Sequence, residues 1–302
     1  MYDIIIVGGG PAGLTAAIYG LRANKSVLVL EKETAGGQIS DSPFVENIPG
    51  FSGISGTEFA DKLVDQALSQ GAEMEFGEVV AIRDLKTCKE VETDMGDVFE
   101  GRTVILSTGA KHRHLGLPGE EEFIGNGISF CAVCDGAFYR DQVVAMAGGG
   151  NTALVEAVML SDLVKKLYIL QDLPFLTGEK KYQDILNEKD NVEIITGVKI
   201  TQLLGTDALN GLVIENTAGI SRRIELDGLF VAIGHVPQNE AFKALADLDS
   251  AGYAIADETL KTKTPGLFVA GDCRTKKVRQ VVTAASDGAQ AALAAVEYLD
   301  RN

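Results

Sequence analysis

The sequence is short of several features that would identify whole classes of protein. Its 302 residues contain 27 Lys and Arg against 43 Asp and Glu, a net charge of −16, which argues against general binding to nucleic acid or to anionic membranes. Four cysteines are too few for a disulfide scaffold, so we expect a reducing, cytoplasmic environment. No apolar run approaches the roughly 18 to 20 residues that span a bilayer. The N-terminus has no basic segment before its apolar run, so we expect no signal peptide.

What the chain does have is 46% hydrophobic residues, 34 glycines and a repeated alternation of short strands and helices. Its length predicts roughly two domains of about 150 residues each. A β-branched strand (2–7), a helix (11–21) and a second strand (26–30) form one βαβ unit. The same order of strand, helix and strand recurs at 143–147, 154–163 and 167–170. This pattern predicts an α/β fold with two Rossmann-like, three-layer dinucleotide-binding domains.

Segments between and after these units predict how the domains are arranged. Residues 78–104 and 193–229 have the alternating short runs of antiparallel β-ribbons, and the Ala-rich residues 287–299 predict a closing helix. Two linker-like stretches, 111–122 and 234–239, each follow a similar strand-then-glycine phrase. We therefore expect one domain to be inserted into another. The expected boundaries are 1–113 and 241–302 for the outer domain and 114–240 for the inserted one.

A glycine-rich turn follows the first strand. Gly8, Gly10 and Gly13 form a G-x-G-x-x-G pattern, and Glu31 ends the next strand 18 residues after Gly13. Such glycines allow a tight turn and close backbone approach, and the helix N-terminus presents free N–H groups to a pyrophosphate. The acid can accept hydrogen bonds from an adenosine ribose. Because strand, turn, helix, strand and acid are in register, dinucleotide binding is favoured over a purely structural turn.

Further candidate binding residues lie outside this turn. Residues 267–270 read as a buried strand that delivers Gly271 and Asp272 to its end. An Asp at that position can bind a cofactor hydroxyl, and the alternative is a surface turn with a capping Asp. After six more residues the candidates continue with Arg279 and Gln280. Weaker candidates, each of which fits an ordinary loop as well, are Gln38 and Asn47.

The segment that most clearly indicates a chemical role is a C-x-x-C-D motif formed by Cys131, Cys134 and Asp135. Two residues between cysteines allow a small disulfide ring, and a helix that starts there would lower the pKa of a thiolate. Asp135 could pass a proton to a leaving thiolate. The alternatives are half of a zinc site or an inert pair of cysteines.

The remaining cysteines and histidines give weaker signals. His112 and His114 are closer in sequence than the usual H-x₃₋₅-H zinc pattern, so we expect no metal. Cys88 and Cys273 have no cysteine partner nearby in the sequence, and we expect them to be structural thiols.

A second glycine-rich turn, at 148–153, has the G-x-G-x-x-A form. A site for the 2′-phosphate of NADP needs Arg or Lys in the loop that follows the next strand, and none occurs before Lys180. Asp172, 19 residues after Ala153, would repel that phosphate but could accept a hydrogen bond from the free 2′-hydroxyl of NAD. The turn is therefore present without the residues that read the phosphate.

The order of these motifs resembles a known family. GGGPAG, GGQ, ENIPGF, CAVCDG, GGGNTA and GDC followed by RQ stand in the order found in low-molecular-weight flavin-dependent thioredoxin reductases, over essentially the full chain. The resemblance implies an FAD-binding outer domain, a nicotinamide-type inserted domain, a homodimer, and thioredoxin as the protein that is reduced. By position, the residues expected to hold FAD are Gly8, Gly10, Gly13, Glu31, Gln38, Asn47, Gly271, Asp272, Arg279 and Gln280.

The same resemblance implies the catalytic roles. Cys134 would face the flavin, Cys131 would attack the disulfide of thioredoxin, and Asp135 would be the acid–base residue. The inserted domain would rotate between a flavin-reducing and a thioredoxin-reducing position. Two hypotheses from other classes are a flavin reductase that acts on ferredoxin and NADP without a disulfide, and a non-catalytic flavin-binding sensor. Neither accounts for the cysteine pair with its adjacent Asp.

The chain departs from the family in the loop after the second glycine unit. NADPH-using members have a His-Arg-Arg phrase and a further Arg four residues later, where this chain has Gln171, Asp172, Leu173 and Thr177. Two charge-assisted contacts are worth about 1.5 to 3 kcal/mol each, or roughly 10² to 10⁴ in affinity together. The loss resembles the ferredoxin-dependent flavin thioredoxin reductases, so we expect reduced ferredoxin as donor, with NADH through Asp172 or unusual NADPH use as alternatives. An acidic ferredoxin would need a local basic patch, for which the candidates are Lys165-Lys166, Lys180-Lys181 and Lys276-Lys277.

Overall fold

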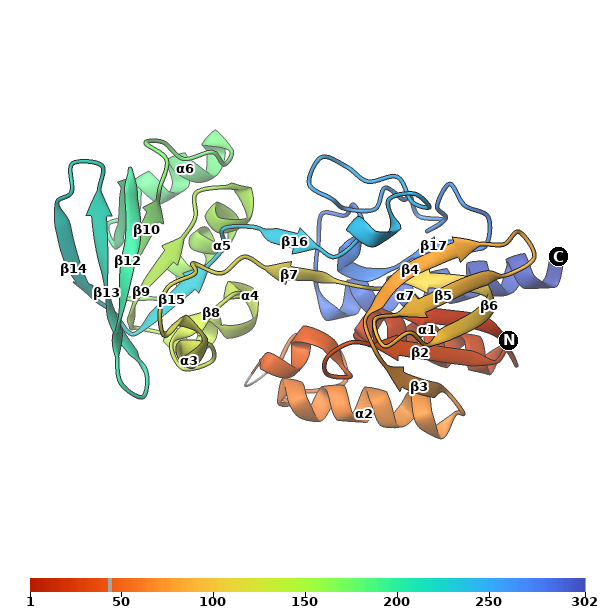
Figure 1. Cartoon of the computed structure of the whole chain (residues 1–302). Coiled ribbons are helices and arrows are strands. Elements are labelled where there is room, and N and C mark those ends of the chain that lie inside the picture. Colours follow the sequence, from red (N-terminus) through yellow and green to blue (C-terminus); the bar gives the residue numbers. More distant parts are fainter. Residues whose placement is uncertain (43–44, 302) are drawn as a thin grey trace. The chain divides into compact units, whose positions relative to one another are not determined.

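The computed structural model describes residues 1–42 and 45–301 and contains two compact units (Figure 1). The terminal unit comprises Met1–Lys111 and Val236–Asn302, and the inserted unit comprises His112–His235. The inserted unit begins two residues and ends five residues before the expected 114–240. At the two crossings, strands β7 (Ala110–His112) and β16 (His235–Pro237) pair with each other. Both crossings lie within the predicted linker-like stretches, and backbone pairing between β7 and β16 accompanies them.

The terminal unit is built on one large mixed sheet. Its strands are β1 (Tyr2–Val7), β2 (Val27–Glu31), β3 (Glu73–Phe76), β4 (Val79–Asp84), β5 (Lys89–Thr93), β6 (Val98–Leu106) and β17 (Leu267–Val269). Its helices are α1 (Pro11–Arg22), α2 (Gly56–Ser69) and α7 (Val281–Arg301), with the short 3₁₀ turns η1 (Gly37–Asp41), η3 (Glu240–Phe242) and η4 (Gly271–Cys273). The sheet order is β3-β2-β1-β6-β5-β4, and β17 also pairs with β6. Strands β3, β2, β1, β6 and β17 are parallel neighbours, whereas β4 and β5 continue from β6 as an antiparallel ribbon.

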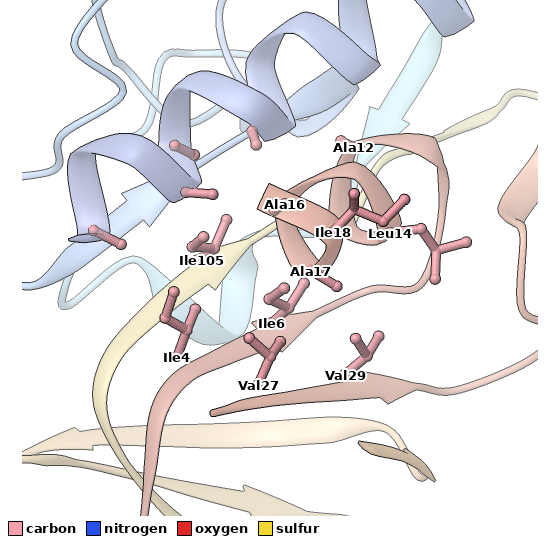
Figure 2. Close-up of a cluster of buried hydrophobic side chains, with 14 of the residues drawn as sticks. Ile4, Ile6, Ala12, Leu14, Ala16, Ala17, Ile18, Val27, Val29 and Ile105 are labelled. Carbon is pink, nitrogen blue, oxygen red and sulfur yellow. The ribbon is translucent and has the colours of Figure 1, made fainter. Parts of the chain in front are cut away.

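Strand β1 is buried on both faces because its alternate apolar side chains belong to two cores. Ile4 and Ile6 pack with α1 and α7, whereas Ile5 and Val7 pack with residues of β4 and β5. Figure 2 shows the first of these cores, where side chains of β1, β2 and β6 lie against α1. A continuous apolar run is typical of a parallel strand that is covered on both faces. The first strand of the dinucleotide pattern is therefore held rigidly at its carboxyl end, where the glycine turn begins.

The inserted unit has a five-stranded parallel sheet and a separate antiparallel ribbon. The sheet strands are β8 (Ile128–Ser129), β9 (Val143–Ala147), β10 (Lys166–Gln171), β11 (Val192–Thr196) and β15 (Gly228–Val231). The ribbon strands are β12 (Val198–Gly205), β13 (Leu209–Asn216) and β14 (Ser221–Glu225). The helical segments are α3 (Glu120–Phe123), α4 (Ala132–Asp135), η2 (Gly136–Tyr139), α5 (Asn151–Ser161) and α6 (Lys180–Asn187). The order of the parallel sheet is β11-β10-β9-β15-β8.

This unit also has three layers. Val144 and Met146 of β9 pack with α5, whereas Ala145 and Ala147 pack on the other side with residues of β13 and β14. The predicted α/β fold with two three-layer dinucleotide-type domains is confirmed. Within the described part of the chain, none of the helices has the length and apolar character needed to cross a bilayer.

Three expectations about individual elements are corrected. The stretch 193–229 is not one antiparallel ribbon, because β11 and β15 at its two ends pair in the parallel sheet. Helix α5 begins at Asn151, inside the glycine turn, because the free N–H groups of such a turn are those of the helix's own first residues. Helix α7 begins at Val281, six residues before the expected start at 287.

Candidate functional site

Of the three glycines in the first G-x-G-x-x-G pattern, two are required by the packing of the protein and one is not. Gly8 has φ +104°, and a Cβ there would lie 2.8 Å from the Ser107 carbonyl carbon. A Cβ at Gly13 would overlap the carbonyl oxygen of Gly8. At Gly10, by contrast, the nearest neighbour of a Cβ would be the Cα of Gly37, 3.9 Å away. Gly10 therefore leaves the start of α1 open, as close approach of a pyrophosphate requires.

Glu31 lies at this turn and is already engaged by backbone N–H groups. The residue is 8% exposed and stands at the end of β2. Its Oε2 accepts the N–H of Gly9 at 2.6 Å, and its Oε1 accepts those of Lys32 and Glu33 at 2.8 and 2.9 Å. Each carboxylate oxygen has two lone pairs, so the side chain is fixed at the turn and can still accept a ribose hydroxyl.

Asp272 enters the same neighbourhood from the other end of the chain. Strand β17 delivers it into η4, and Gly271 before it has φ +79° with room only for a hydrogen, since a Cβ would lie 2.8 Å from the Cβ of Ala12 in α1. Oδ1 of Asp272 is buried and has no hydrogen-bond partner among the described residues, although Nζ of Lys276 lies 3.9 Å away. Burial raises the pKa of this carboxyl, while Lys276 and Arg279 act in the opposite direction. A buried acceptor without a partner fits a ligand hydroxyl.

The remaining predicted cofactor residues also lie in the terminal unit. Asn47 Nδ2 donates to Gln280 Oε1 at 3.3 Å, and Gln38 Nε2 donates to the Ala110 carbonyl at 3.0 Å. The guanidinium of Arg279 lies 4.2 Å from the ring centre of Tyr253. Contacts between residues far apart in sequence, such as Asn47 with Gln280 and Gly271 with Ala12, thus bring the predicted cofactor residues together.

A buried ion-pair network that the sequence analysis missed supports the Asp272 turn. Asp287 of α7 is 3% exposed. Its carboxylate accepts both Nε and Nη2 of Arg274 at 2.8 Å, Nζ of Lys276 at 2.9 Å and the N–H of Gly271 at 3.0 Å. Burial opposes ionisation, but the hydrogen bonds from Arg274 and Lys276 lower the pKa of Asp287. An acid within the predicted closing helix was the available signal.

Cys131 and Cys134 form a disulfide at the start of α4. Ser129 Oγ accepts the N–H of Cys131 at 3.1 Å and donates to Oδ2 of Asp135 at 2.6 Å. The other oxygen of Asp135, Oδ1, is buried and has no hydrogen-bond partner in the described part of the chain. Burial raises the pKa of Asp135, and the Ser129 hydrogen bond only partly opposes this. A carboxyl of this kind can hold a proton close to the cysteine pair.

A second acidic group beside the disulfide was not foreseen. Oε2 of Glu156, on α5, accepts the N–H of Ala132 at 3.3 Å. Burial raises the pKa of Glu156 to about 7, with the Ala132 N–H acting in the opposite direction. The signal in the sequence was a single charged residue in an otherwise apolar helix directly after the second glycine turn.

The second glycine turn repeats the first in its packing but not in its acid. A Cβ at Gly148 would overlap the Ala232 carbonyl oxygen, whereas one at Gly150 would meet nothing closer than Thr177 Oγ1 at 3.8 Å. Gly9 lies against Glu31, and the equivalent Gly149 lies against Gln171. Gln171 ends β10 as Glu31 ends β2, and Asp172 follows it as an exposed residue.

The loop after β10 folds back onto this turn. The N–H groups of Thr177 and Gly178 donate to the Gly149 carbonyl at 2.9 and 2.8 Å, and the N–H of Glu179 donates to Asn151 Oδ1 at 2.7 Å. A Cβ at Gly149 would lie 2.8 Å from Cδ2 of Leu176. The loop thus covers the turn with its own backbone and an apolar side chain, and it carries no cation before Lys180.

Comparisons with known proteins identify the family. The profile of the pyridine nucleotide-disulphide oxidoreductases matches residues 2–288. The chain is 37% identical over 302 residues to a thioredoxin reductase of Listeria innocua, covering 99% of this chain and 94% of that one. The chain belongs to the low-molecular-weight thioredoxin reductase family. It is therefore an oxidoreductase, and the family implies a flavin cofactor.

Two further comparisons cover nearly the whole chain. A crystal structure of thioredoxin reductase from Streptococcus pyogenes superposes with a TM-score of 0.93 at 38% identity, covering 100% of this chain and 99% of that chain. A "34.2 kDa protein in rubredoxin operon" of Clostridium pasteurianum is 40% identical over 299 residues, 98% of this chain and 97% of that protein. The resemblance inferred from the motifs is confirmed at the level of this family.

The three histidines of this family member form an aromatic cluster in the inserted unit. The rings of His112 and His114 stack on Phe130 with centroids 4.8 and 5.1 Å away, and His235 lies 4.4 Å from His112. Burial, followed by the neighbouring His235 and His114, lowers the pKa of His112 to about 4. In residues 1–42 and 45–301 no three His, Cys, Asp or Glu side chains are grouped as metal ligands would be.

Cys273 and Cys88 are free thiols. Cys273 is fully buried and lies 3.2 Å from the Ala270 carbonyl oxygen, and burial raises the pKa of its thiol. A buried thiol with a raised pKa is unreactive, so Cys273 has the character expected of a structural cysteine.

Most of the candidate basic patch is paired with acids. Lys166 pairs with Glu193, Lys180 with Asp184, Lys181 with Glu179, and Lys276 with Asp287. Lys276 is buried in that pair, whereas Lys165 and Lys277 are exposed. The lysine pairs therefore offer much less positive surface than their sequence suggested.

Proposed function

We propose that this protein is an FAD-dependent thioredoxin reductase that passes electrons through the flavin and the Cys131–Cys134 disulfide to thioredoxin, with reduced ferredoxin as the electron donor. The observation that carries the proposal is a disulfide joined to a buried carboxyl, Asp135, in a chain whose terminal unit also offers an open dinucleotide turn. A sensor would need the turn but not the cysteine pair with its proton-holding neighbour.

The terminal unit fits FAD. The open position at Gly10 and the unsatisfied Oδ1 of Asp272 match a pyrophosphate and a hydroxyl respectively. When bound, FAD supplies both one-electron and two-electron redox chemistry. The residues proposed to hold it are Gly8, Gly10, Gly13, Glu31, Gln38, Asn47, Gly271, Asp272, Arg279 and Gln280.

The cysteine segment would perform the exchange with thioredoxin. Two electrons break the Sγ–Sγ bond and leave Cys131 and Cys134 reduced. Cys131 as thiolate attacks one sulfur of the thioredoxin disulfide and forms a mixed disulfide, and the departing sulfur takes a proton from Asp135. Cys134 then passes its proton to Asp135 and attacks Cys131, which restores the Cys131–Cys134 disulfide. The second thioredoxin sulfur leaves as a thiolate, takes a proton from water and completes reduced thioredoxin. Burial raises the pKa of Asp135, which suits a group that holds a proton and then gives it to a leaving sulfur.

Ferredoxin is favoured as donor because the inserted unit lacks the groups that would bind NADPH tightly. No Lys or Arg lies between Gln171 and Lys180, and the loop is hydrogen-bonded back onto Gly149. Two missing charge-assisted contacts to a phosphate cost about 1.5 to 3 kcal/mol each, or roughly 10² to 10⁴ in affinity. The second candidate donor is NADH, which the retained turn with its open Gly150 favours.

Rapid anaerobic mixing of the oxidised flavoprotein with reduced ferredoxin, NADH or NADPH tests the donor. We expect fast bleaching of the flavin absorbance with ferredoxin and slow bleaching with either nucleotide at micromolar concentration. Fast bleaching by micromolar NADPH would refute the donor assignment, and fast bleaching by NADH alone would replace it with the second candidate. We further propose that the protein is a homodimer. Its molar mass, measured by light scattering after size-exclusion chromatography, would check this.

A further inference from the structure

The carboxylate of Glu156 is attached to the loop that the disulfide closes. Its Oε2 accepts the N–H of Ala132, which stands between the two cysteines and is fully buried. The segment after the disulfide packs on the same helix, since a Cβ at Gly136 would lie 3.0 Å from Cδ2 of Leu160. Glu156 therefore has a fixed position next to the Cys131–Cys134 loop, on a different element from Asp135.

Little other charge surrounds Glu156. It is the only charged residue of α5, and β9 carries none. The titratable residues of the other elements packed against α5 are Asp135 of α4, Tyr139 of η2, Lys166 and Tyr168 of β10, and Lys180, Lys181, Tyr182 and Asp184 of α6. The three lysines are engaged with Glu193, Asp184 and Glu179. Burial raises the pKa of Glu156 to about 7, so the group changes its charge in the physiological range.

We propose that Glu156 is a positioning residue whose carboxylate couples reduction of the Cys131–Cys134 disulfide to the uptake of a proton. The proposal rests on the redox role proposed for this disulfide. Reduction by a dithiol or by the flavin adds two electrons, breaks the Sγ–Sγ bond and creates two sulfur groups that are thiolates until they are protonated. A thiolate in the loop repels an ionised Glu156, so reduction near and above neutral pH draws a proton to the carboxylate.

The sign of the effect follows from this repulsion. Below about pH 6 Glu156 is neutral in both redox states and has no influence on the disulfide. Above about pH 8 it is ionised in the oxidised protein and opposes thiolate formation, so wild-type protein is harder to reduce than a variant without the charge. The difference between the two proteins should therefore appear only as the pH rises through about 7.

The test is a redox titration of the holoprotein in dithiothreitol buffers between pH 6 and pH 9. Alkylation and mass spectrometry of the peptide containing Cys131 and Cys134 measure the fraction reduced. Glu156→Gln retains an oxygen that can accept the Ala132 N–H but cannot titrate. At pH 8.5 we expect the disulfide of this variant to be about tenfold easier to reduce than that of wild type, a shift of about 30 mV in reduction potential. At pH 6 the two potentials should be indistinguishable. An equal shift at every pH, or none, would overturn the proposal.

Matched variants separate the coupling from a structural effect. Glu188→Gln removes a carboxylate from the exposed end of α6 and should titrate as wild type at every pH. Glu156→Asp keeps a titrating group and should retain a pH-dependent potential. If Glu156→Gln does not fold, infrared difference spectra of wild type decide the matter, because reduction at pH 7.5 must then increase absorption by protonated carboxyl groups. Since dithiothreitol is the only reductant and neither thioredoxin, ferredoxin nor a nicotinamide nucleotide enters these measurements, the coupling and the proposed function can fail separately.

Discussion

Replacing Gly10 with Ala should abolish tight FAD binding without unfolding the protein. Gly10 has φ −79° and ψ −174°, which alanine adopts freely, and its Cβ would meet no protein atom closer than 3.9 Å. Gly10 is the N-cap of α1, where alanine is less favourable than glycine, so the expected loss of stability is about 0.5 to 1 kcal/mol. The added methyl group would instead occupy the space proposed for the pyrophosphate, and we expect at least about a 100-fold loss of affinity, or about 2.7 kcal/mol.

Gly13→Ala should behave in the opposite way. Its Cβ would overlap the carbonyl oxygen of Gly8 and lie 2.7 Å from Ser107 Oγ. The Gly8 carbonyl cannot move away without displacing the turn between β1 and α1, so we expect a loss of about 3 kcal/mol or more from a total that is about 5 to 15 kcal/mol for a typical protein. The same methyl group thus tests ligand space at one glycine and protein packing at the other.

Two measurements on flavin-free protein separate these effects: quenching of FAD fluorescence on titration, and unfolding in urea. Gly150→Ala is the matched control, because Gly150 is the N-cap of α5 with φ −84° and its Cβ would lie 3.8 Å from the nearest atom. It should leave FAD affinity unchanged. Wild-type FAD affinity in Gly10→Ala would refute the assignment of the open glycine to the cofactor, and so would an equal loss in Gly150→Ala.

The other predictions concern the disulfide, the ion-pair network and the donor site. Cys134→Ser should retain flavin absorbance but lose thioredoxin reduction in a coupled assay; activity within tenfold of wild type would contradict the proposed exchange. Asp287→Asn should destabilise the protein by about 3 to 5 kcal/mol in urea, because Arg274 remains buried without its partner. Since the pKa of Asp287 is lowered, wild type should lose this contribution to stability as the pH falls below about 4. The free energy of unfolding of the variant should therefore change less with pH in this acidic range. Adding Leu173→Arg together with Thr177→Arg should strengthen NADPH binding at least about tenfold by flavin bleaching, and an unchanged affinity would show that the loop conformation, not its charge, excludes NADPH.

Local patterns were sufficient for the repeating units. Strand β9 has the predicted bounds, α1 ends one residue later than predicted, and β2 is shifted by one residue at both ends. The agreement is close because buried parallel strands read as continuous apolar runs and glycine turns mark where each one stops. Helix α2 was missed although Ser55 caps it by accepting the N–H of Glu58, a pattern that a search for helix starts would detect. The pairing of β11 and β15 was assigned wrongly because a short strand has the same appearance in a parallel and an antiparallel sheet.

The sequence by itself determined the two dinucleotide turns, the C-x-x-C-D motif and the family, because each of these depends on residue types at short, fixed spacings. Tertiary structure alone decided which carboxylates matter around them. Glu156 and Asp287 acquire their properties from burial and from partners 24 and 16 residues away. Strand register likewise decides that the side chain of Gln171 meets Gly149 at the second turn. Burial and charge pairing join residues that no local pattern links, so these groups become visible only when the chain is folded.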